Sequence, residues 1–292
     1  MSERPILVTG ADGMLGRALQ ERLTLPDGPV ADILWTDVPE LDITDEAAAR
    51  RIIERERPGV IVNCAAMTDV DGCEGRREEA FRVNGHGVAG LAGAANAADS
   101  LLVQISTDFI FSGDAARPYR EDDQPGPLSV YGESKLAGET AARQAARHLI
   151  VRTSWLYGPG GRNFVEAICR HAAAGTPLRV VGDQVGCPTY TRDLAEALLR
   201  LLNVEARGTF HACGREAVSW FAFAQAIVNL WRPSTAVEEI AFTELNRPAR
   251  RPAFSVLDCA KLLEVANYRL PGVSQSLPKY LKELEDELPE EP

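Results

Sequence analysis

The chain has 292 residues, of which 45% are hydrophobic and 25% charged, as is ordinary for an enzyme with one large domain or two coupled ones. Its net charge of −11 argues against a nucleic-acid backbone or an anionic membrane as a partner. No apolar run approaches the ~20 residues that a membrane span requires, and a predicted strand follows the start of the chain without a signal peptide. We therefore expect a soluble cytoplasmic protein.

The six cysteines are scattered, without a C-x-x-C pair, and the four histidines are equally dispersed. Disulfide frameworks and zinc sites need clustered ligands at short, regular spacings. The sequence therefore predicts reduced thiols and no metal site.

A glycine-rich turn follows the first predicted strand, residues 5–9. Gly10, Gly13 and Gly16 stand at G-x-x-G-x-x-G spacing, and helical periodicity follows over residues 17–25. Glycines let the backbone approach a pyrophosphate, and the helix N-terminus then offers free N–H groups. The bare pattern is also compatible with an ordinary strand-to-helix turn. Its position at the opening of a βαβ unit favours a dinucleotide site.

A second predicted strand, residues 33–36, ends at Asp37. A carboxylate about 20 residues beyond the glycine motif binds the adenosine ribose hydroxyls in dinucleotide sites, although a turn or helix-cap aspartate is the alternative. Residues 38–42 contain no basic side chain that would accept a 2′-phosphate. We therefore expect NADH to be preferred, with NADPH as the alternative cofactor.

The pattern continues with a helix ending near residue 57, a strand at 60–63, a long helix at 80–98 and a strand at 101–106. The last of these strands delivers Thr107 to the carboxyl edge of the sheet, where open parallel sheets bind their substrates. Thr107 either satisfies a turn or binds a substrate carbonyl. Its place between the glycine motif and the next feature favours the second role.

Tyr131 and Lys135 stand four residues apart at the start of a helix predicted to run to about residue 147. At that spacing both side chains lie on one helical face. An ammonium about 4 Å from the phenol would lower the tyrosine pKa by as much as ~3 units at an effective dielectric constant of ~20. An ordinary surface pair is the alternative, and the position of the pair after Thr107 favours acid-base chemistry.

The remaining elements complete an α/β fold. We expect a polar loop at 112–127 that forms a rim or lid, strands at 148–153, 178–181 and 208–211, and helices at 163–174 and 192–203. From residue 219 the predicted strands and helices no longer alternate at regular spacing. Residues 283–292 are acidic and are predicted to form a solvated tail. We predict a Rossmann-like, doubly wound parallel sheet in residues 1–155, with returning elements near 190–215. Residues 156–292 would form mainly a smaller, substrate-binding lobe.

Together these motifs resemble the extended branch of the short-chain dehydrogenase/reductase family, and within it the dTDP-4-dehydrorhamnose reductases. The resemblance covers about residues 5–270. It rests on seven motifs in one order, at residues 10–16, 63–71, 106–111, 130–139, 152–157, 183–189 and 251–255.

The resemblance implies a residue set. The implied cofactor-binding residues are Gly10, Gly13, Met14, Leu15, Gly16, Asp37, Asp42, Ile43, Ala66, Met67 and Thr68, with Tyr131 and Lys135. Tyr131 would be the proton donor, Lys135 its activator and Thr107 a partner of the sugar carbonyl. Thr107, Asp108 and Trp155 would hold the nucleotide sugar. Phe109 and Met67 depart from the family, which often has Tyr at the first position and His or Tyr at the second.

The implied reaction is hydride transfer from NAD(P)H to C4 of dTDP-4-dehydro-6-deoxy-L-mannose, which gives dTDP-L-rhamnose. A nucleotide-sugar 4,6-dehydratase would carry an Asp-Glu pair after the threonine, whereas here Phe109 follows Asp108. The motifs are also compatible with another nucleotide-sugar 4-ketoreductase, with a 4-epimerase, and with a non-catalytic subunit like the regulatory subunit of methionine adenosyltransferase. Some relatives are dimers, in places bridged by a metal, so a homodimer is one state that the resemblance allows.

Overall fold

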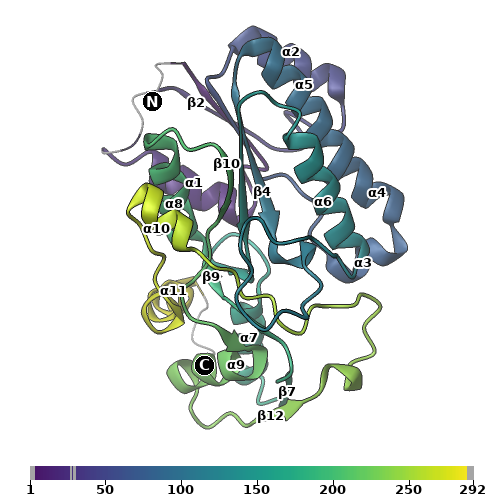
Figure 1. The fold of residues 1–292 in the computed structure, drawn as a ribbon. Helices are drawn as coiled ribbons and strands as arrows, with labels where there is room; N and C mark the ends of the chain where they lie inside the picture. Colours follow the sequence, from purple (N-terminus) through teal and green to yellow (C-terminus); the bar gives the residue numbers. More distant parts are fainter. Residues whose placement is uncertain (1–3, 27, 29–30, 288–292) are drawn as a thin grey trace.

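A computed structural model describes residues 4–26, 28 and 31–287, and within them the chain forms a parallel six-stranded sheet with helices on both faces (Figure 1). The strand order is β2-β1-β3-β4-β5-β10. The strands are β1 (Ile6–Thr9), β2 (Ile33–Thr36), β3 (Val60–Asn63), β4 (Leu101–Thr107), β5 (His148–Thr153) and β10 (Gly208–His211). The order reverses between β1 and β3, and such a switch point is where doubly wound sheets bind ligands. The predicted fold class is confirmed.

Alternating residues of the strands pack on opposite faces of the sheet. Ile6 and Val8 pack with α1 (Met14–Leu23) and α8 (Thr191–Asn203). Leu7 packs on the other face, which is covered by three helices: α2 (Glu46–Glu56), α5 (Val88–Ala98) and α6 (Val130–Ala142). Because both faces are buried, the strands are nearly continuous runs of aliphatic residues.

Several predicted helix boundaries are wrong. The first helix starts at Met14 because Gly13 already serves as its N-cap. The long helix predicted at 80–98 is divided into α4 (Arg77–Phe81), a π-helical segment (Arg82–Gly87) and α5, and α3 (Val70–Gly75) was not predicted. The helix predicted to reach residue 147 ends at Ala142, because residues 143–147 turn the chain back to the sheet.

The lower part of Figure 1 is a second lobe with its own core. Strand β7 (Leu178–Val181) pairs with β12 (Val237–Ile240), against α7 (Phe164–Ala173) and α9 (Trp220–Trp231). Helix α11 (Val273–Glu287) packs on α9, whereas α10 (Ala260–Ala266) packs on α8. The shorter elements are β6 (Leu156–Tyr157), β8 (Val185–Gly186), β9 (Thr189–Tyr190), β11 (Val218–Ser219) and the 3₁₀ turns Asp108–Ile110 and Phe242–Glu244.

The region after residue 219 is therefore more regular than its sequence suggests. The predicted solvated tail is wrong for Glu283, which belongs to α11, accepts a hydrogen bond from Tyr190 at 3.0 Å and pairs with Arg192. Residues 288–292 of the predicted tail lie outside the described residues.

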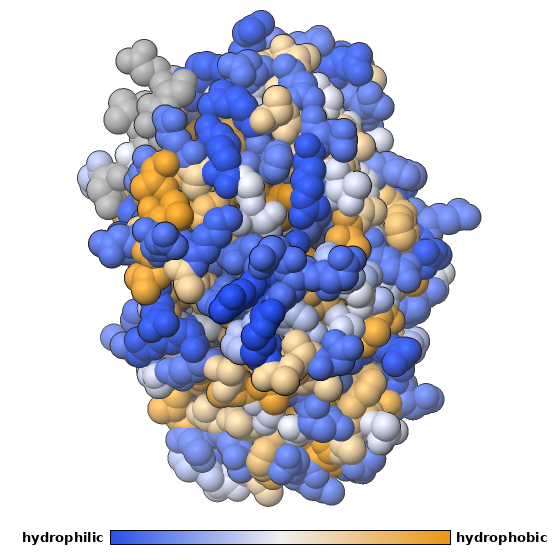
Figure 2. Space-filling view, in the orientation of Figure 1, coloured by the Kyte–Doolittle hydropathy of each residue, from blue (hydrophilic) through white to orange (hydrophobic). Residues whose placement is uncertain are grey.

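Hydrophilic residues cover much of the face shown in Figure 2, and hydrophobic residues gather at its left over α10, where Leu263 and Val265 are exposed. In the described part of the chain, no helix has the length and apolarity that a bilayer span requires.

Candidate active site

The glycine turn after β1 leaves an open backbone cradle. Gly10 has φ +67°, and a Cβ there would lie 2.6 Å from the backbone nitrogen of Ala65. A Cβ at Gly16 would lie 2.4 Å from the carbonyl oxygen of Gly10. No side chain caps α1 at Gly13, and Met14 and Leu15 form its first turn. These uncapped N–H groups, with no side chains to block them, suit a pyrophosphate.

The Asp37 carboxylate lies against this cradle. Its Oδ2 accepts a hydrogen bond from the Asp12 N–H at 2.9 Å, and its Oδ1 accepts one from the Val38 N–H at 2.7 Å. The Glu40 carboxylate bonds the backbone of Asp37 at 3.2 Å, so a second anion is close. Cradle and carboxylate together have the chemistry that binds an adenosine diphosphate ribose.

Asp42 and Ile43 lie beside a cation that the sequence did not point to. The side chain of Asp42 accepts from the Thr44 N–H at 2.8 Å, and Ile43 is buried against Gly87. Hydrogen bonds from Thr44 are the main cause of the lowered pKa of Asp42, and the charge of Arg82 contributes. Arg82 approaches Thr44 Oγ1 at 3.5 Å from the π-helical segment.

The segment Ala66, Met67 and Thr68, beyond β3, is anchored by Asn84. The Asn84 side chain accepts from the Met67 N–H at 2.9 Å and donates to the Met67 carbonyl at 3.0 Å. It also donates to Ser134 Oγ at 2.9 Å. Asn84 belongs to the π-helical segment, and such bulges occur frequently at functional sites. Asn84 thus ties this backbone to α6.

Thr107, Tyr131 and Lys135 are brought together where β4 meets α6. The Thr107 hydroxyl lies beside the Tyr131 phenol, whose pKa it lowers, and it donates to Asp108 Oδ1 at 3.0 Å. Lys135 is buried, and its Nζ donates to the Ile105 carbonyl of β4 at 2.7 Å. Ser129 caps α6 by accepting from the Gly132 N–H. The cap and the strand therefore fix one helical face relative to Thr107.

The pKa values differ from the expectation for a lysine-activated phenol. Burial raises the pKa of Tyr131 above its usual value, and the Thr107 side chain opposes this only in part. Burial lowers the pKa of Lys135 to about 8, although the negative charge of Glu139 acts in the opposite direction. The expected lowering of the Tyr131 pKa is wrong for this structure, because desolvation dominates and Lys135 bonds to the strand. A protonated phenol is the form that donates a proton.

A buried ion pair lies beneath this site, one helical turn after Lys135. Glu139 and Arg152 are both essentially inaccessible, and their side chains are bonded at 2.8 and 2.9 Å. Ser106 Oγ also donates to Glu139 at 2.7 Å. The pair therefore joins α6 to β4 and β5. The sequence motif contained Glu139, but its role was missed because its partner Arg152 lies on a separate element.

Asp108 is buried directly after Thr107. Its Oδ2 atom has no hydrogen-bond partner among the described residues, and burial raises the pKa of Asp108 to about 7. An unpaired buried carboxylate oxygen next to Thr107 is a ready acceptor for a ligand hydroxyl.

Trp155 stands in a left-handed backbone conformation, with φ +46°. Its ring stacks on Trp220, with centroids 3.5 Å apart and planes 4° apart. A Cβ at Gly186 would lie 2.4 Å from the Trp155 indole, so this ring is packed on a glycine as well. The stacked tryptophans therefore connect the segment after β5 with helix α9 of the lobe.

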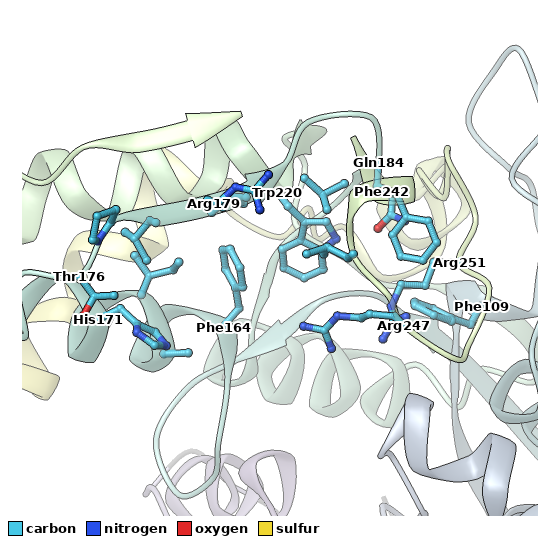
Figure 3. Close-up of a pocket in the computed structure, with 17 residues that line it drawn as sticks. Phe109, Phe164, His171, Thr176, Arg179, Gln184, Trp220, Phe242, Arg247 and Arg251 are labelled. Carbon is cyan, nitrogen blue, oxygen red and sulfur yellow. The ribbon is translucent and has the colours of Figure 1, made fainter. Parts of the chain in front are cut away.

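A cavity of about 480 Å³ lies in the lobe (Figure 3). Phe109 lines it and also packs edge-to-face on Tyr131, with centroids 5.7 Å apart, so the cavity begins one side chain away from Tyr131. Its lining combines aromatic rings with cations. Its principal side chains are Phe109, Phe164, Trp220, Phe242, Arg179, Arg247, Arg251, Gln184, His171 and Thr176.

Comparison with known proteins agrees with this arrangement. The family described as the RmlD substrate binding domain matches residues 4–286. The chain belongs to this family. A dTDP-4-dehydrorhamnose reductase of Streptomyces griseus is 44% identical over 260 residues, covering 86% of this chain and 84% of that protein. A probable dTDP-4,6-dihydroxy-2-methyloxan-3-one 4-ketoreductase of Streptomyces antibioticus is 40% identical, covering 86% and 85%.

A solved structure extends the comparison to the cofactor. It is the dTDP-4-dehydrorhamnose reductase of Bacillus anthracis in complex with NADP, with a TM-score of 0.92 and 35% identity. The match covers 97% of this chain and 100% of that one. This RmlD-family chain is therefore an oxidoreductase that uses a nicotinamide cofactor.

Proposed function

We propose that the chain reduces dTDP-4-dehydro-6-deoxy-L-mannose to dTDP-L-rhamnose with NAD(P)H. The observation that carries the proposal is the position of Phe109, which lines the lobe cavity and packs edge-to-face on Tyr131. Arginines suit a diphosphate and aromatic rings suit a base, so the cavity has the chemistry of a nucleotide-sugar site. Relatives named for this activity support the same interpretation.

In this proposal Tyr131 donates the proton to the sugar oxygen at C4. The Thr107 hydroxyl turns from Asp108 to donate a hydrogen bond to the same oxygen. Hydroxyl donors held close to the atom where negative charge develops stabilise the transition state. Lys135 holds positive charge beneath Tyr131 and binds the nicotinamide ribose. Asp108 accepts a sugar hydroxyl, and Trp155 packs on the sugar. The nicotinamide, when bound, supplies the hydride.

We further propose that the cradle residues hold the cofactor and that NADH is the better donor. Asp37 would accept the ribose 2′-hydroxyl, whereas a 2′-phosphate would meet Asp37 and Glu40. Arg82, whose guanidinium lies 3.5 Å from Thr44 Oγ1, is a cation that would oppose that repulsion. Because its guanidinium sits on the Asp42 side of the loop, we expect it to offset the repulsion only in part.

A second keto sugar is favoured by one specific observation, the 40% identity to the probable 4-ketoreductase of Streptomyces antibioticus. Such a substrate differs in ring substituents but would use the same diphosphate and the same proton donor. Reduction of a 4-keto group is common to both substrates. The preference between them would depend on the part of the cavity that holds the sugar ring.

The deciding experiment is an assay of reduced-nicotinamide oxidation with a panel of nucleotide 4-keto sugars. We expect the highest kcat/KM with dTDP-4-dehydro-6-deoxy-L-mannose and identification of dTDP-L-rhamnose as the product. A higher kcat/KM with another keto sugar would make that sugar the preferred substrate, and the proposed reaction class would still stand. No oxidation with any keto sugar, in a chain that binds NADH, would support a non-catalytic binding protein.

A further inference from the structure

Asp71 connects the two halves of the molecule. It lies in α3, on the cofactor side, yet its carboxylate is bonded to the loop at residues 245–251 of the lobe. Arg251 donates to it twice, at 3.1 and 2.9 Å, and Arg247 donates at 2.9 Å. The backbone N–H of Ala249 adds a fourth bond at 3.2 Å.

The cofactor-side end of this connection is itself anchored. Asp69 caps α3 by accepting from the Gly72 N–H at 3.0 Å, and Asn84 holds the preceding segment at Met67. Because α3 follows that segment directly, the position of Asp71 is set by the cofactor-binding sheet. The loop that bonds to it therefore takes its position from the same sheet.

The arginines line the cavity, and Asp71 lies behind them, outside the lining. Figure 3 shows Arg247 and Arg251 together at the end of the cavity where Phe109 lies. Arg251 is 15% exposed, donates to the Ala249 carbonyl and lies 5.8 Å from the Phe242 ring. Arg247 is 53% exposed. Burial opposes the charge on Asp71, but the hydrogen bonds from Arg251 and Arg247 bring its pKa to about 2.

Building on the proposed function, we propose that Asp71 is a positioning residue for the diphosphate of the nucleotide sugar. Its fixed carboxylate orients the Arg251 guanidinium through two bonds, and a guanidinium has further N–H donors for a phosphate. Arg247 makes a single hydrogen bond to Asp71 and is exposed to solvent. Exposed ion pairs contribute at most about 1 kcal/mol to stability. When the nucleotide sugar binds, Arg247 therefore leaves Asp71 and bonds to the diphosphate, whereas Arg251 keeps both of its hydrogen bonds to Asp71.

The test compares Asp71→Asn with Asp69→Asn in the full-length chain. Asp69 is a matched control, because it is on the same short segment and pairs with Arg76 at the surface. Calorimetric titration with dTDP measures the nucleotide half of the site, and a separate titration measures NADH. We expect Asp71→Asn to weaken dTDP binding roughly tenfold, about the effect of one charge-assisted hydrogen bond. NADH affinity and kcat at saturation should stay within about twofold, as should both affinities in Asp69→Asn.

A double variant separates positioning from general loosening of the fold. If Asp71 acts through Arg251, Asp71→Asn with Arg251→Gln binds dTDP about as weakly as Arg251→Gln alone. Fully additive losses, unchanged dTDP affinity in Asp71→Asn, or a parallel loss of NADH affinity would each overturn the proposal. Absence of dTDP binding by the unmodified chain would also overturn it. Tight dTDP binding without turnover of any 4-keto sugar would instead overturn the proposed reaction and leave the role of Asp71 standing.

Discussion

The carboxyl edge of the sheet and the cavity of the lobe differ in what determines the charge of their side chains. At the edge, burial dominates: it lowers the pKa of Lys135 to about 8 and raises that of Asp108 to about 7. In the cavity, each lining arginine faces a carboxylate, as Arg251 faces Asp71 and Arg179 faces Glu244. Burial also keeps the Tyr131 phenol in its protonated form, the form that donates a proton, whereas paired arginines suit anion binding.

The two regions also differ in how their residues are assembled. The edge uses residues at the ends of neighbouring parallel strands, so the sheet itself brings Gly10, Asp37 and Thr107 to one side. The cavity draws on α7, β7, α9 and the 245–251 loop, which are far apart in the sequence. We infer that chemistry is concentrated at the edge and recognition in the cavity, and substitutions in the two regions test this division.

The largest effect is expected for Tyr131→Phe. The change removes the hydroxyl that we propose as the proton donor but keeps the ring that packs on Phe109, so the fold and the cofactor cradle should be unaffected. Loss of a general acid costs about 10²- to 10⁴-fold in kcat. Steady-state kinetics and an NADH titration measure the two effects separately. Near-normal kcat would remove Tyr131 from the mechanism.

Lys135→Ala should reduce kcat/KM roughly 10- to 100-fold and weaken NADH binding, since the proposal gives it two roles. With a folded pKa of about 8, Lys135 is an ammonium below that pH and a neutral amine above it. In the unmodified enzyme kcat/KM should therefore fall as pH rises through about 8, and the alanine variant should lack that step. Stability moves the other way, increasing from pH 8 toward 10.5, because the unfolded chain keeps the proton longer.

An unchanged NADH affinity in Lys135→Ala would contradict the second role and leave the lysine acting on Tyr131 alone. A pH profile identical in the two proteins would assign the alkaline step to another group.

Trp220→Ala tests the recognition side of the division. It removes the ring that stacks on Trp155 and a wall of the cavity, so KM for the nucleotide sugar should rise about tenfold. NADH affinity should not change. Trp231→Ala, at the far end of α9 and outside the cavity lining, is the control that should leave KM unaltered. A fall in kcat with constant KM would place Trp220 on the catalytic side.

The smallest effect concerns cofactor choice. Repulsion of roughly 1–2 kcal/mol between Asp37 and a 2′-phosphate gives NADH about a 5- to 30-fold advantage in kcat/KM. Asp37→Ala should narrow this gap, and Arg82→Ala should widen it, because Arg82 offsets part of the repulsion. Equal or better efficiency with NADPH in the unmodified enzyme would contradict the proposal.

The amino-acid sequence by itself determined the parallel sheet, because aliphatic runs separated by helical periodicity allow few other arrangements. It also pointed to the glycine turn, Asp37, Thr107 and Tyr131, since each directly follows a strand or starts a helix. It did not determine the helix ends. The break at residues 82–87 depends on Asn84 reaching Met67, a contact that local periodicity does not encode.

The tertiary structure alone decided the electrostatics and the lobe. A lysine four residues from a tyrosine suggests a lowered phenol pKa, but burial and the bond from Lys135 to Ile105 reverse that expectation. The pairing of Asp71 with Arg247 and Arg251 joins residues about 180 positions apart. Local propensity acts over one or two turns of chain, whereas desolvation and ion pairing depend on which distant segments meet.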